Sequence, residues 1–339
     1  MANTKLSAKR GLKMDTHIRR LLIIMVCWFI FMGIMKGRKF YSVVNFQTMF
    51  AQFPEFGLMS LGIMVCMITG GIDLSTVGVA NLVSICMATL MKGMANEESE
   101  IAAYVIPLCF LIAILMGALA GAFNGLLVSK VRIPPILATL GTSELFTGIG
   151  IVITDGKAVS KLPRMYSSAI NSKIFGLIPT QLVFFAAMAL VTWFLLMRTT
   201  YGTKIYMIGT SSKAAVFSGI RTDLLLVKTY MLSGICSALG GMVMLANYNS
   251  ARADYGTVYT LQCVLIVVLG GVNPNGGSGR ISGVVLAICL LQMLQTGINR
   301  FPQISSYYIS LIWGAVLILV MVFNYFTEHN IRLFKARRS

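Results

Sequence analysis

Charged side chains are scarce in this chain. They make up 12% of its 339 residues, and only 11 of them are Asp or Glu against 28 Lys and Arg. Hydrophobic residues reach 57%, and the mean hydropathy is +0.80. Too little polar surface remains to cover a soluble domain of this length, which excludes an ordinary soluble protein. The composition therefore predicts an all-α integral membrane protein.

Histidine and a nucleotide-binding loop are also missing where chemistry would need them. The two histidines, His17 and His329, lie in the terminal segments, so no His-centred triad, zinc site or proton relay is expected at membrane depth. The glycine-rich run 270–280 lacks the lysine of a Gly-x4-Gly-Lys-Ser/Thr phosphate loop. We therefore expect no enzyme activity, no metal site and no cofactor bound by this chain.

The cysteines and the basic residues give no other class of protein. Seven cysteines fall inside apolar runs at irregular spacing, which supports neither a disulfide framework nor a zinc site. The formal charge of +17 comes from short, scattered clusters without an aromatic-basic module, so nucleic acid is not an expected partner. Anionic membrane lipid and the accumulation of Lys and Arg in cytoplasmic loops explain the charge better.

Apolar segments long enough to cross a bilayer recur along the whole chain, and we interpret residues 1–339 as one membrane domain. The first segment has no small-residue cleavage site after it, which favours an uncleaved anchor. The sequence predicts about ten transmembrane helices near 21–35, 52–70, 74–91, 103–128, 136–154, 179–197, 229–248, 258–272, 281–298 and 306–326.

Charge predicts the orientation. With both termini in the cytoplasm, the basic segment 1–20, the Lys130/Arg132 turn, the loop 198–228, Arg280 and the tail 327–339 all lie inside. The loop 155–178 then lies outside, although Lys36, Arg38 and Lys39 run against the rule. The loop 198–228 is unusually long and basic for a simple anchor, and we expect it to dock a cytoplasmic partner.

Polar residues inside the apolar segments are the candidate solute contacts. Asp73 follows paired glycines between two spans; it either caps the next helix or takes part in the solute path. Glu144 is an acid on a spanning helix and should face a cavity or a partner, whereas the small and hydroxylated residues also suit helix packing. The predicted path residues are Asp73, Ser75, Asn81, Asn124, Thr139, Thr142, Glu144, Gln262 and Asn299.

Two glycine pairs mark turns between spans. Thr69-Gly70-Gly71-Ile72-Asp73 and Leu269-Gly270-Gly271-Val272-Asn273 each end an apolar run, a weak internal echo of the kind found in transporters. We expect Gly70, Gly71, Gly270 and Gly271 to act as hinges.

Taken together, these motifs resemble the membrane permease subunits of ribose-type, monosaccharide-importing ABC transporters, over nearly the whole chain. The residues that carry the resemblance are GGIDLS at 70–75, Ile133-Pro134-Pro135 with Thr139-Leu140-Gly141-Thr142, Tyr201-Gly202 through Ser218-Gly219-Ile220, Val268-Leu269-Gly270-Gly271, Gly276-Gly277-Ser278-Gly279 and Ser305-Ser306-Tyr307-Tyr308.

The resemblance implies a bacterial cytoplasmic-membrane importer of a monosaccharide such as ribose. Two permease chains, identical or paralogous, would form the path, two separate ABC ATPase subunits would hydrolyse ATP, and an extracytoplasmic sugar-binding protein would deliver the solute. It also implies that a short coupling helix seats on the ATPase. The residues that match this element or surround it are Gly202, Lys213, Ala214, Ala215, Gly219 and Ile220.

Two positions depart from the family pattern. Lys213 stands where the coupling element usually has glutamate, which reverses the charge offered to the partner. Thr76 adds a residue after GGIDLS and so rotates the following helix by about 100°. An alternative function is an ion-gradient-driven secondary transporter, which would rely on buried acids such as Asp73, Glu144 and Glu55.

Overall fold

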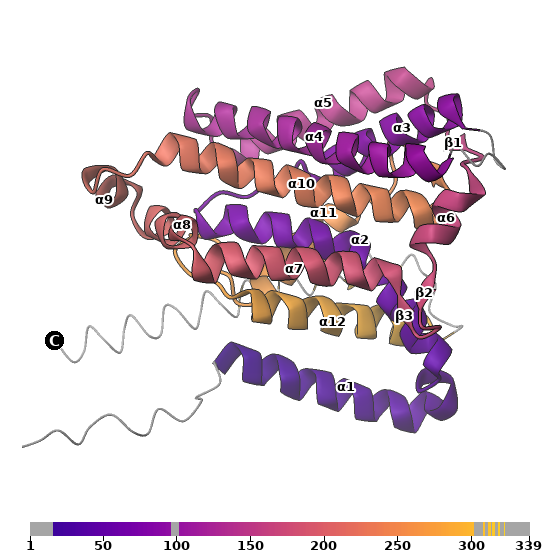
Figure 1. The fold of residues 1–339 in the computed structure, drawn as a ribbon. Coiled ribbons are helices and arrows are strands. Elements are labelled where there is room, and N and C mark those ends of the chain that lie inside the picture. Colours follow the sequence, from indigo (N-terminus) through magenta and orange to yellow (C-terminus); the bar gives the residue numbers. More distant parts are fainter. Residues whose placement is uncertain are drawn as a thin grey trace, which may run out of the picture.

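The computed structural model describes residues 16–95 and 102–301 together with isolated positions between 308 and 322. Within these residues, eight helices are long and apolar enough to cross a membrane, and they lie roughly side by side (Figure 1). This confirms the expected all-α membrane protein. The eight are α1 (Thr16–Phe40), α2 (Val43–Ile68), α3 (Thr76–Met94), α4 (Ala102–Ser129), α5 (Pro135–Thr154), α7 (Thr180–Arg198), α10 (Thr222–Tyr248) and α12 (Ile281–Ile298).

Short elements lie at the two ends of the bundle (Figure 1). The antiparallel pair β1 (Val159–Ser160) and β4 (Ser250–Ala251), the hairpin β2 (Lys173–Ile174) and β3 (Ile178–Pro179), and helix α6 (Arg164–Ile170) occupy one end. Helices α8 (Thr200–Thr210) and α9 (Ser212–Phe217) project from the other end. The basic loop predicted at 198–228 is thus mostly helical.

The predicted span at 258–272 is wrong as a complete crossing. Helix α11 there runs only from Tyr259 to Leu269, and 11 residues rise about 16 Å, roughly half of a bilayer core. Hydropathy alone cannot separate a half-helix from a short span. The predicted last span, 306–326, falls largely outside the described residues, as do residues 1–15 of the N-terminal segment and the tail 327–339.

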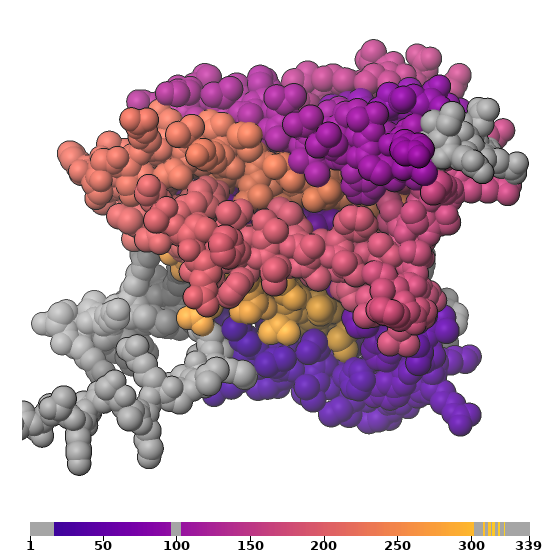
Figure 2. Space-filling view, in the orientation of Figure 1, coloured from indigo at the N-terminus to yellow at the C-terminus, as the bar shows by residue number. Residues whose placement is uncertain are grey.

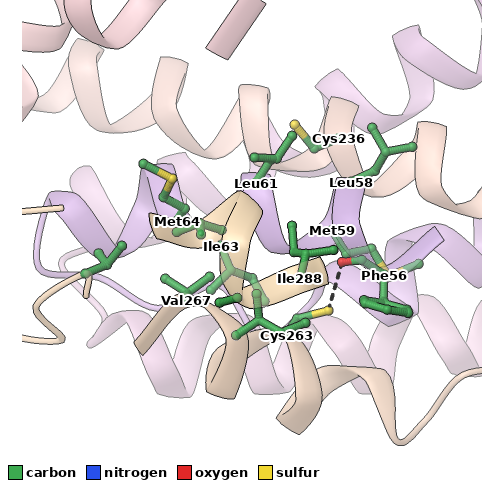
Figure 3. Packing of buried hydrophobic residues seen from close by; sticks show 14 of the residues in the cluster. Phe56, Leu58, Met59, Leu61, Ile63, Met64, Cys236, Cys263, Val267 and Ile288 are labelled. Carbon is green, nitrogen blue, oxygen red and sulfur yellow. Dashed lines mark hydrogen bonds between the residues drawn. The ribbon is translucent and has the colours of Figure 1, made fainter. Parts of the chain in front are cut away.

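Helix α2 forms the centre of the bundle. In the most apolar 18-residue stretch of α2, 89% of the residues are buried, because α10, α7, α11 and α12 surround the helix. Side chains such as Leu58, Met59, Leu61 and Ile63 are completely buried in this core (Figure 3). A helix that is apolar on all sides suits such a central position. Helix α1 is the opposite case: only 11% of the corresponding stretch is buried, and the helix packs mainly on α12.

Helices α4 and α10 make the most extensive helix contact. Gly117, Gly121 and Gly125, spaced one turn apart on α4, face the α10 backbone. A Cβ at Gly117 would overlap the Gly234 carbonyl oxygen, and one at Gly121 would overlap that of Tyr230. Small residues of this spacing let two membrane helices approach closely, which offsets the missing hydrophobic drive in lipid.

Contacts between distant segments show which of them share one end of the bundle. Lys130 forms an ion pair with Asp223 at 3.2 Å, and His17 lies against Gly271. The first contact joins the turn after α4 to the start of α10, and the second joins the start of α1 to the loop after α11. All four segments lie at the end of the bundle from which α8 and α9 project (Figure 1). The charge pattern predicts these same segments to share the cytoplasmic side; which side of the membrane this end occupies stays a prediction.

Candidate functional site

Helix α2 ends at a left-handed glycine. Gly70 has a φ of +86°, and the Gly71 amide donates back to the Cys66 carbonyl at 3.3 Å, the bond pattern of a Schellman motif. Residues 71–75 are not helical, and α3 begins only at Thr76. Glycine adopts this φ without the Cβ strain of other residues. The chain can therefore leave α2 abruptly and turn into the bundle.

Asp73 lies at the centre of a buried hydrogen-bond network and is 1% exposed. Its Oδ1 accepts from the Ser75 hydroxyl at 2.6 Å and from the Ser75 amide at 3.0 Å, while Oδ2 accepts from the Ser233 hydroxyl on α10 at 2.7 Å. Asn124 of α4 donates its Nδ2 to Ser75 Oγ at 2.7 Å. The carboxyl group thus joins the start of α3 to α4 and α10.

Thr139 fastens the same segment to α5. Its hydroxyl accepts from the Leu74 amide at 3.1 Å and donates to the Pro135 carbonyl at 2.8 Å. Thr142, which is 4% exposed, donates to the Thr139 carbonyl at 3.2 Å. The segment 70–75 is therefore held from α4, α5 and α10 at once.

Both oxygens of Asp73 are used by this network. Its bond to the Ser75 amide, two residues on, is that of an Asx turn just before α3, whose N-cap is Ser75 and whose first amides receive no side-chain cap. Its bond to Ser233 joins this turn to α10. Ser233 could not be recognised from the sequence, because a serine beside a glycine in an apolar span is typical of packing. A solute contact by Asp73, Ser75, Asn124, Thr139 and Thr142 stays a prediction.

The other predicted path residues lie elsewhere. Asn81 lies in α3 beside the loop 249–258, and Gln262 lies in α11; each is 1% exposed. Glu144 of α5 is exposed on the surface of the single chain rather than buried. Asn299 is exposed as well and caps the C-terminus of α12. The structure thus does not bring the nine residues into one site.

The second glycine pair forms the same type of helix end, displaced by one residue. Gly271 also has a φ of +86°, and the Val272 amide donates to the Val267 carbonyl at 3.2 Å. Gly70 therefore corresponds to Gly271, and not to Gly270 as the sequence echo suggested. Gly270 is instead small because Val284 of α12 packs against it.

Glycines from three segments meet at the end of α2, and we call Gly70, Gly209, Gly276 and Gly277 the glycine junction. The Gly277 amide donates to the Ile68 carbonyl at 2.8 Å. A Cβ at Gly209 of α8 would overlap that carbonyl oxygen, and one at Gly276 would lie 2.7 Å from the Gly70 nitrogen. The backbones of α2, α8 and the 270–280 loop are consequently in direct contact.

Tyr206 adds a side-chain bond to the glycine junction. Tyr206 lies one turn before Gly209 on α8, and its hydroxyl donates to the Gly279 carbonyl at 2.7 Å. Burial raises the pKa of this hydroxyl above its usual value, although the Arg280 charge acts in the opposite direction. The hydroxyl thus stays protonated at physiological pH, and α8 stays bonded to the loop.

Helix α9 carries the predicted coupling residues. Ala215 is 1% exposed and packs on its own chain, whereas Lys213 and Ala214 are exposed. Gly219 ends the helix with a φ of +74°, and a Cβ there would meet open space, so its backbone conformation explains the glycine better than close packing on this chain does. Ile220 is half-buried beside it.

Two further residues complete this end of the chain. Gly202 lies at the sharp bend between α7 and α8, where a Cβ would overlap the Leu196 carbonyl. Phe217 is 93% exposed at the end of α9, and the residues 200–225 protrude at one edge of the surface (Figure 2). Resemblance to the coupling element had drawn attention to the small residues rather than to this aromatic one.

Comparison with known proteins identifies the family. Residues 45–321 match the family described as branched-chain amino acid transport system / permease component. The chain is 30% identical over 306 residues to the autoinducer 2 import system permease protein LsrD of Escherichia coli strain K12, covering 88% of this chain and 89% of the relative. The LsrD protein of Shigella flexneri matches to the same extent. No solved structure matches.

The chain therefore belongs to this permease family. It is a multi-pass protein of the bacterial inner membrane and a transport component without an ATPase site of its own. The resemblance to permeases of ABC importers is confirmed at this level.

Proposed function

We propose that this chain is the membrane permease subunit of an ABC importer for a small polyhydroxylated solute, a monosaccharide or a sugar-like signalling molecule. Two separate ATPase subunits hydrolyse the ATP, and an extracytoplasmic binding protein delivers the solute. The observation that carries the proposal is the glycine junction, because it connects the projecting α8–α9 segment to the interior of the bundle by backbone contact.

The proposed mechanism starts at α9. Movement of a docked ATPase displaces α8 and α9, and α8 meets the Ile68 carbonyl of α2 at Gly209 and the loop at Gly277. Since Gly70 begins the segment that ends in Asp73 and Ser75, displacement at the glycine junction reaches the network that joins α3, α4 and α10. The bundle then changes which side of the membrane its path opens to.

A second permease copy is part of the proposal. Glu144 is exposed near the middle of α5, among exposed apolar residues such as Leu140 and Leu145. A carboxylate that faces hydrocarbon is costly, by about 2.5–3.5 kcal/mol on insertion scales for a central acid. A water-filled path between two copies removes this cost, which supports a dimer that meets along α5.

The solute class rests on the relatives and on the side chains present. The LsrD proteins are named for import of autoinducer 2, and at 30% identity their solute supports a class rather than one compound. Amide and hydroxyl groups such as Asn81 and Gln262 suit a solute rich in hydroxyl groups. Ribose-like sugars and autoinducer 2 both fall in this class.

Reconstitution tests the proposed function. The chain is co-purified with candidate ABC ATPase and binding-protein partners from the same organism and placed in vesicles, and uptake of labelled autoinducer 2 and D-ribose is measured. We expect uptake of one of them to require ATP and the binding protein. Accumulation against a gradient by the permease alone, driven by an ion gradient, would establish the secondary transporter instead.

A further inference from the structure

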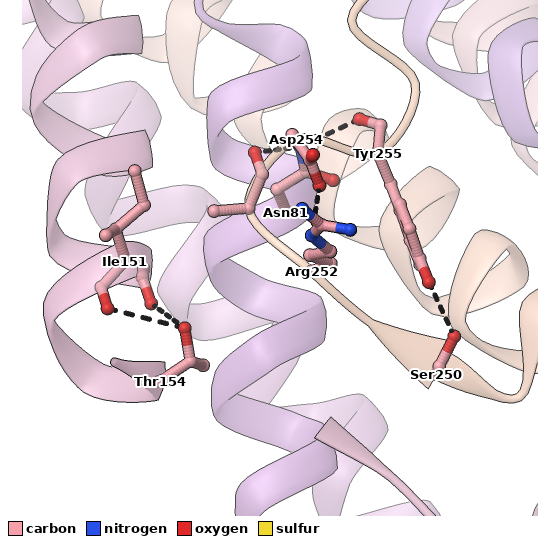
Figure 4. Close-up of polar contacts among 9 residues, drawn as sticks. Asn81, Ile151, Thr154, Ser250, Arg252, Asp254 and Tyr255 are labelled. Carbon is pink, nitrogen blue, oxygen red and sulfur yellow. Dashed lines mark hydrogen bonds and ion pairs between the residues drawn. The ribbon is translucent and has the colours of Figure 1, made fainter. Parts of the chain in front are cut away.

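Non-helical backbone enters the bundle at two places and leads to α3 and α11. One is the segment 70–75; the other is the loop 249–258, which begins at the left-handed Asn249 and ends where α11 starts at Tyr259. Asn81 in α3 donates to the carbonyls of Ala253 and Tyr255, each at 2.8 Å (Figure 4). Broken helices inside a transporter are where solute sites form, because irregular backbone there lines a cavity or a partner surface.

Glu55 lies halfway along α2, next to this loop. It is 4% exposed, and its Oε1 accepts from the Tyr259 hydroxyl at 3.1 Å. Oε2 is buried and accepts no hydrogen bond from the described residues, although the Asn247 side chain lies beside the carboxyl group. A buried acceptor without a donor is costly, so this oxygen is suited to a donor that the chain itself does not supply.

Further unpaired groups and aromatic rings lie on the same elements. Gln262, one helical turn after Tyr259, has a buried Nε2 that donates to none of the described residues. The ring of Phe56 lies 5.8 Å from that of Tyr259. The Tyr259 hydroxyl is 3.1 Å from that of Tyr248, a residue 46% exposed, so hydrogen bonds lead from the surface to Glu55.

From this arrangement we infer that Glu55, Tyr259 and Gln262 bind the hydroxyl groups of the transported solute at the start of α11. The carboxylate accepts hydroxyl hydrogens, the glutamine amide donates to a ring or hydroxyl oxygen, and the aromatic rings cover the apolar C–H face. The inference rests on the proposed function and names residues within it. It differs from the Asp73 network, where both carboxylate oxygens already have donors from the chain.

Uptake kinetics of the reconstituted complex test the inference with Glu55→Gln and Tyr259→Phe. Asp155→Asn is the matched control, since it removes one negative charge at an exposed left-handed position that Asn tolerates. We expect Glu55→Gln to raise the KM for uptake about tenfold and Tyr259→Phe severalfold, because hydrogen bonds to charged groups are the stronger ones. The maximal rate of ATP hydrolysis and the control's KM should be unchanged.

Deoxy analogues locate the contact on the solute. If D-ribose is the solute that the wild-type complex imports, one of its monodeoxy analogues should have a raised KM in the wild type and no additional penalty in Glu55→Gln. If autoinducer 2 is the solute, its deoxygenated analogues serve the same purpose. If the Glu55→Gln complex does not assemble, the same comparison is made with Tyr259→Phe, which keeps the carboxyl group of Glu55 and the aromatic ring.

The outcomes separate the inference from the proposed function. Normal uptake with an unchanged KM and unchanged ranking of analogues in both variants would overturn the inference alone. Loss of a sodium or proton dependence of uptake in Glu55→Gln, with KM for the solute unchanged, would also overturn it and assign the carboxylate to an ion. Failure of the wild-type complex to use ATP would overturn the proposed function first.

Discussion

Two buried acids in this chain differ in how their oxygens are used. Asp73 receives donors from Ser75 and Ser233 on both oxygens, whereas Glu55 receives one hydroxyl on one oxygen within the described residues. A saturated carboxylate holds the protein together, because any solute hydroxyl would have to replace an existing bond. A carboxylate with an unpaired oxygen can accept a hydrogen bond from a ligand without breaking a bond within the protein.

Asp73→Ala tests the structural role of the saturated acid. The change leaves the hydroxyls of Ser75 and Ser233 without their acceptor in a buried position, and we expect the free energy of unfolding to fall by about 2–4 kcal/mol. Thermal unfolding in detergent, followed by size-exclusion chromatography, measures the effect. A melting temperature equal to that of the exposed control Asp155→Asn would contradict the assignment.

Part of the candidate site could be predicted from residue types in the sequence, and the rest became visible only in the structure. The sequence pointed to Asp73, Ser75 and Asn124 because polar groups are conspicuous in apolar spans, and the structure joins them. For Glu144 it predicted a cavity or a partner, and the structure exposes this acid on the single chain, so contact with a partner stays a prediction. Ser233 was missed because its partner is 160 positions away, a distance that no local pattern encodes.

At the scale of elements, the glycine junction joins α2, α8 and the 270–280 loop. Their contacts are between backbones, as in the bond from the Gly277 amide to the Ile68 carbonyl. Such contacts have no flexible side chain to absorb a displacement. We therefore expect a shift of α8 to displace α2 and the loop as well.

Gly209→Ala tests this coupling. The added methyl group would overlap the Ile68 carbonyl and force α8 away from α2, so we expect at least a tenfold loss of ATP-driven uptake. ATP hydrolysis by the assembled complex should persist, which separates uncoupling from misassembly. Gly93→Ala is the control, because nothing lies near a Cβ there. Wild-type uptake by Gly209→Ala would remove the glycine junction from the mechanism.

Elements were predictable where length and hydropathy agree. The seven complete spans after α1 and the first anchor itself follow from apolar runs, although α2 and α10 begin several residues earlier than their runs do. Helix α11 was taken for a full crossing because its apolar run continues through Gly270 and Gly271 into Val272, past the helix end. Helix α9 coincides with the short coupling helix that the resemblance implied at Lys213–Ala215. Helix α8 was not predicted, because its 11 residues are too few to form a membrane span and lie in a segment that was interpreted as a loop.

At the scale of the whole molecule, much of α5 is uncovered by the other residues that the structure describes. Only 28% of the most apolar 18-residue stretch of α5 is buried in the single chain, and its exposed residues include Glu144. Helix α4 is no more buried but lacks a charged residue along its length. The acid therefore distinguishes the α5 surface as the one that needs water or protein rather than lipid.

Disulfide cross-linking tests the dimer. In a cysteine-free background, a cysteine at Gly141, one turn before Glu144 and free of neighbouring atoms, should form dimers between copies in membranes. Ile34→Cys is the control, since Ile34 is 80% exposed on α1, on the opposite side of the bundle from α5 (Figure 1). Equal dimer yields at both positions, or none at Gly141, would count against pairing along α5.

The exposed ring of Phe217 has a consequence for how the protein is produced. Val216 and Phe217 are 55% and 93% exposed side by side at the tip of the projecting helix α9, and contiguous exposed apolar side chains favour aggregation until a partner covers them. If the ATPase of the proposed complex covers these side chains, permease made in excess of that ATPase should be degraded, and the cellular amount of this chain should follow the supply of the ATPase. Co-expression should raise the yield of intact protein more than any change of detergent.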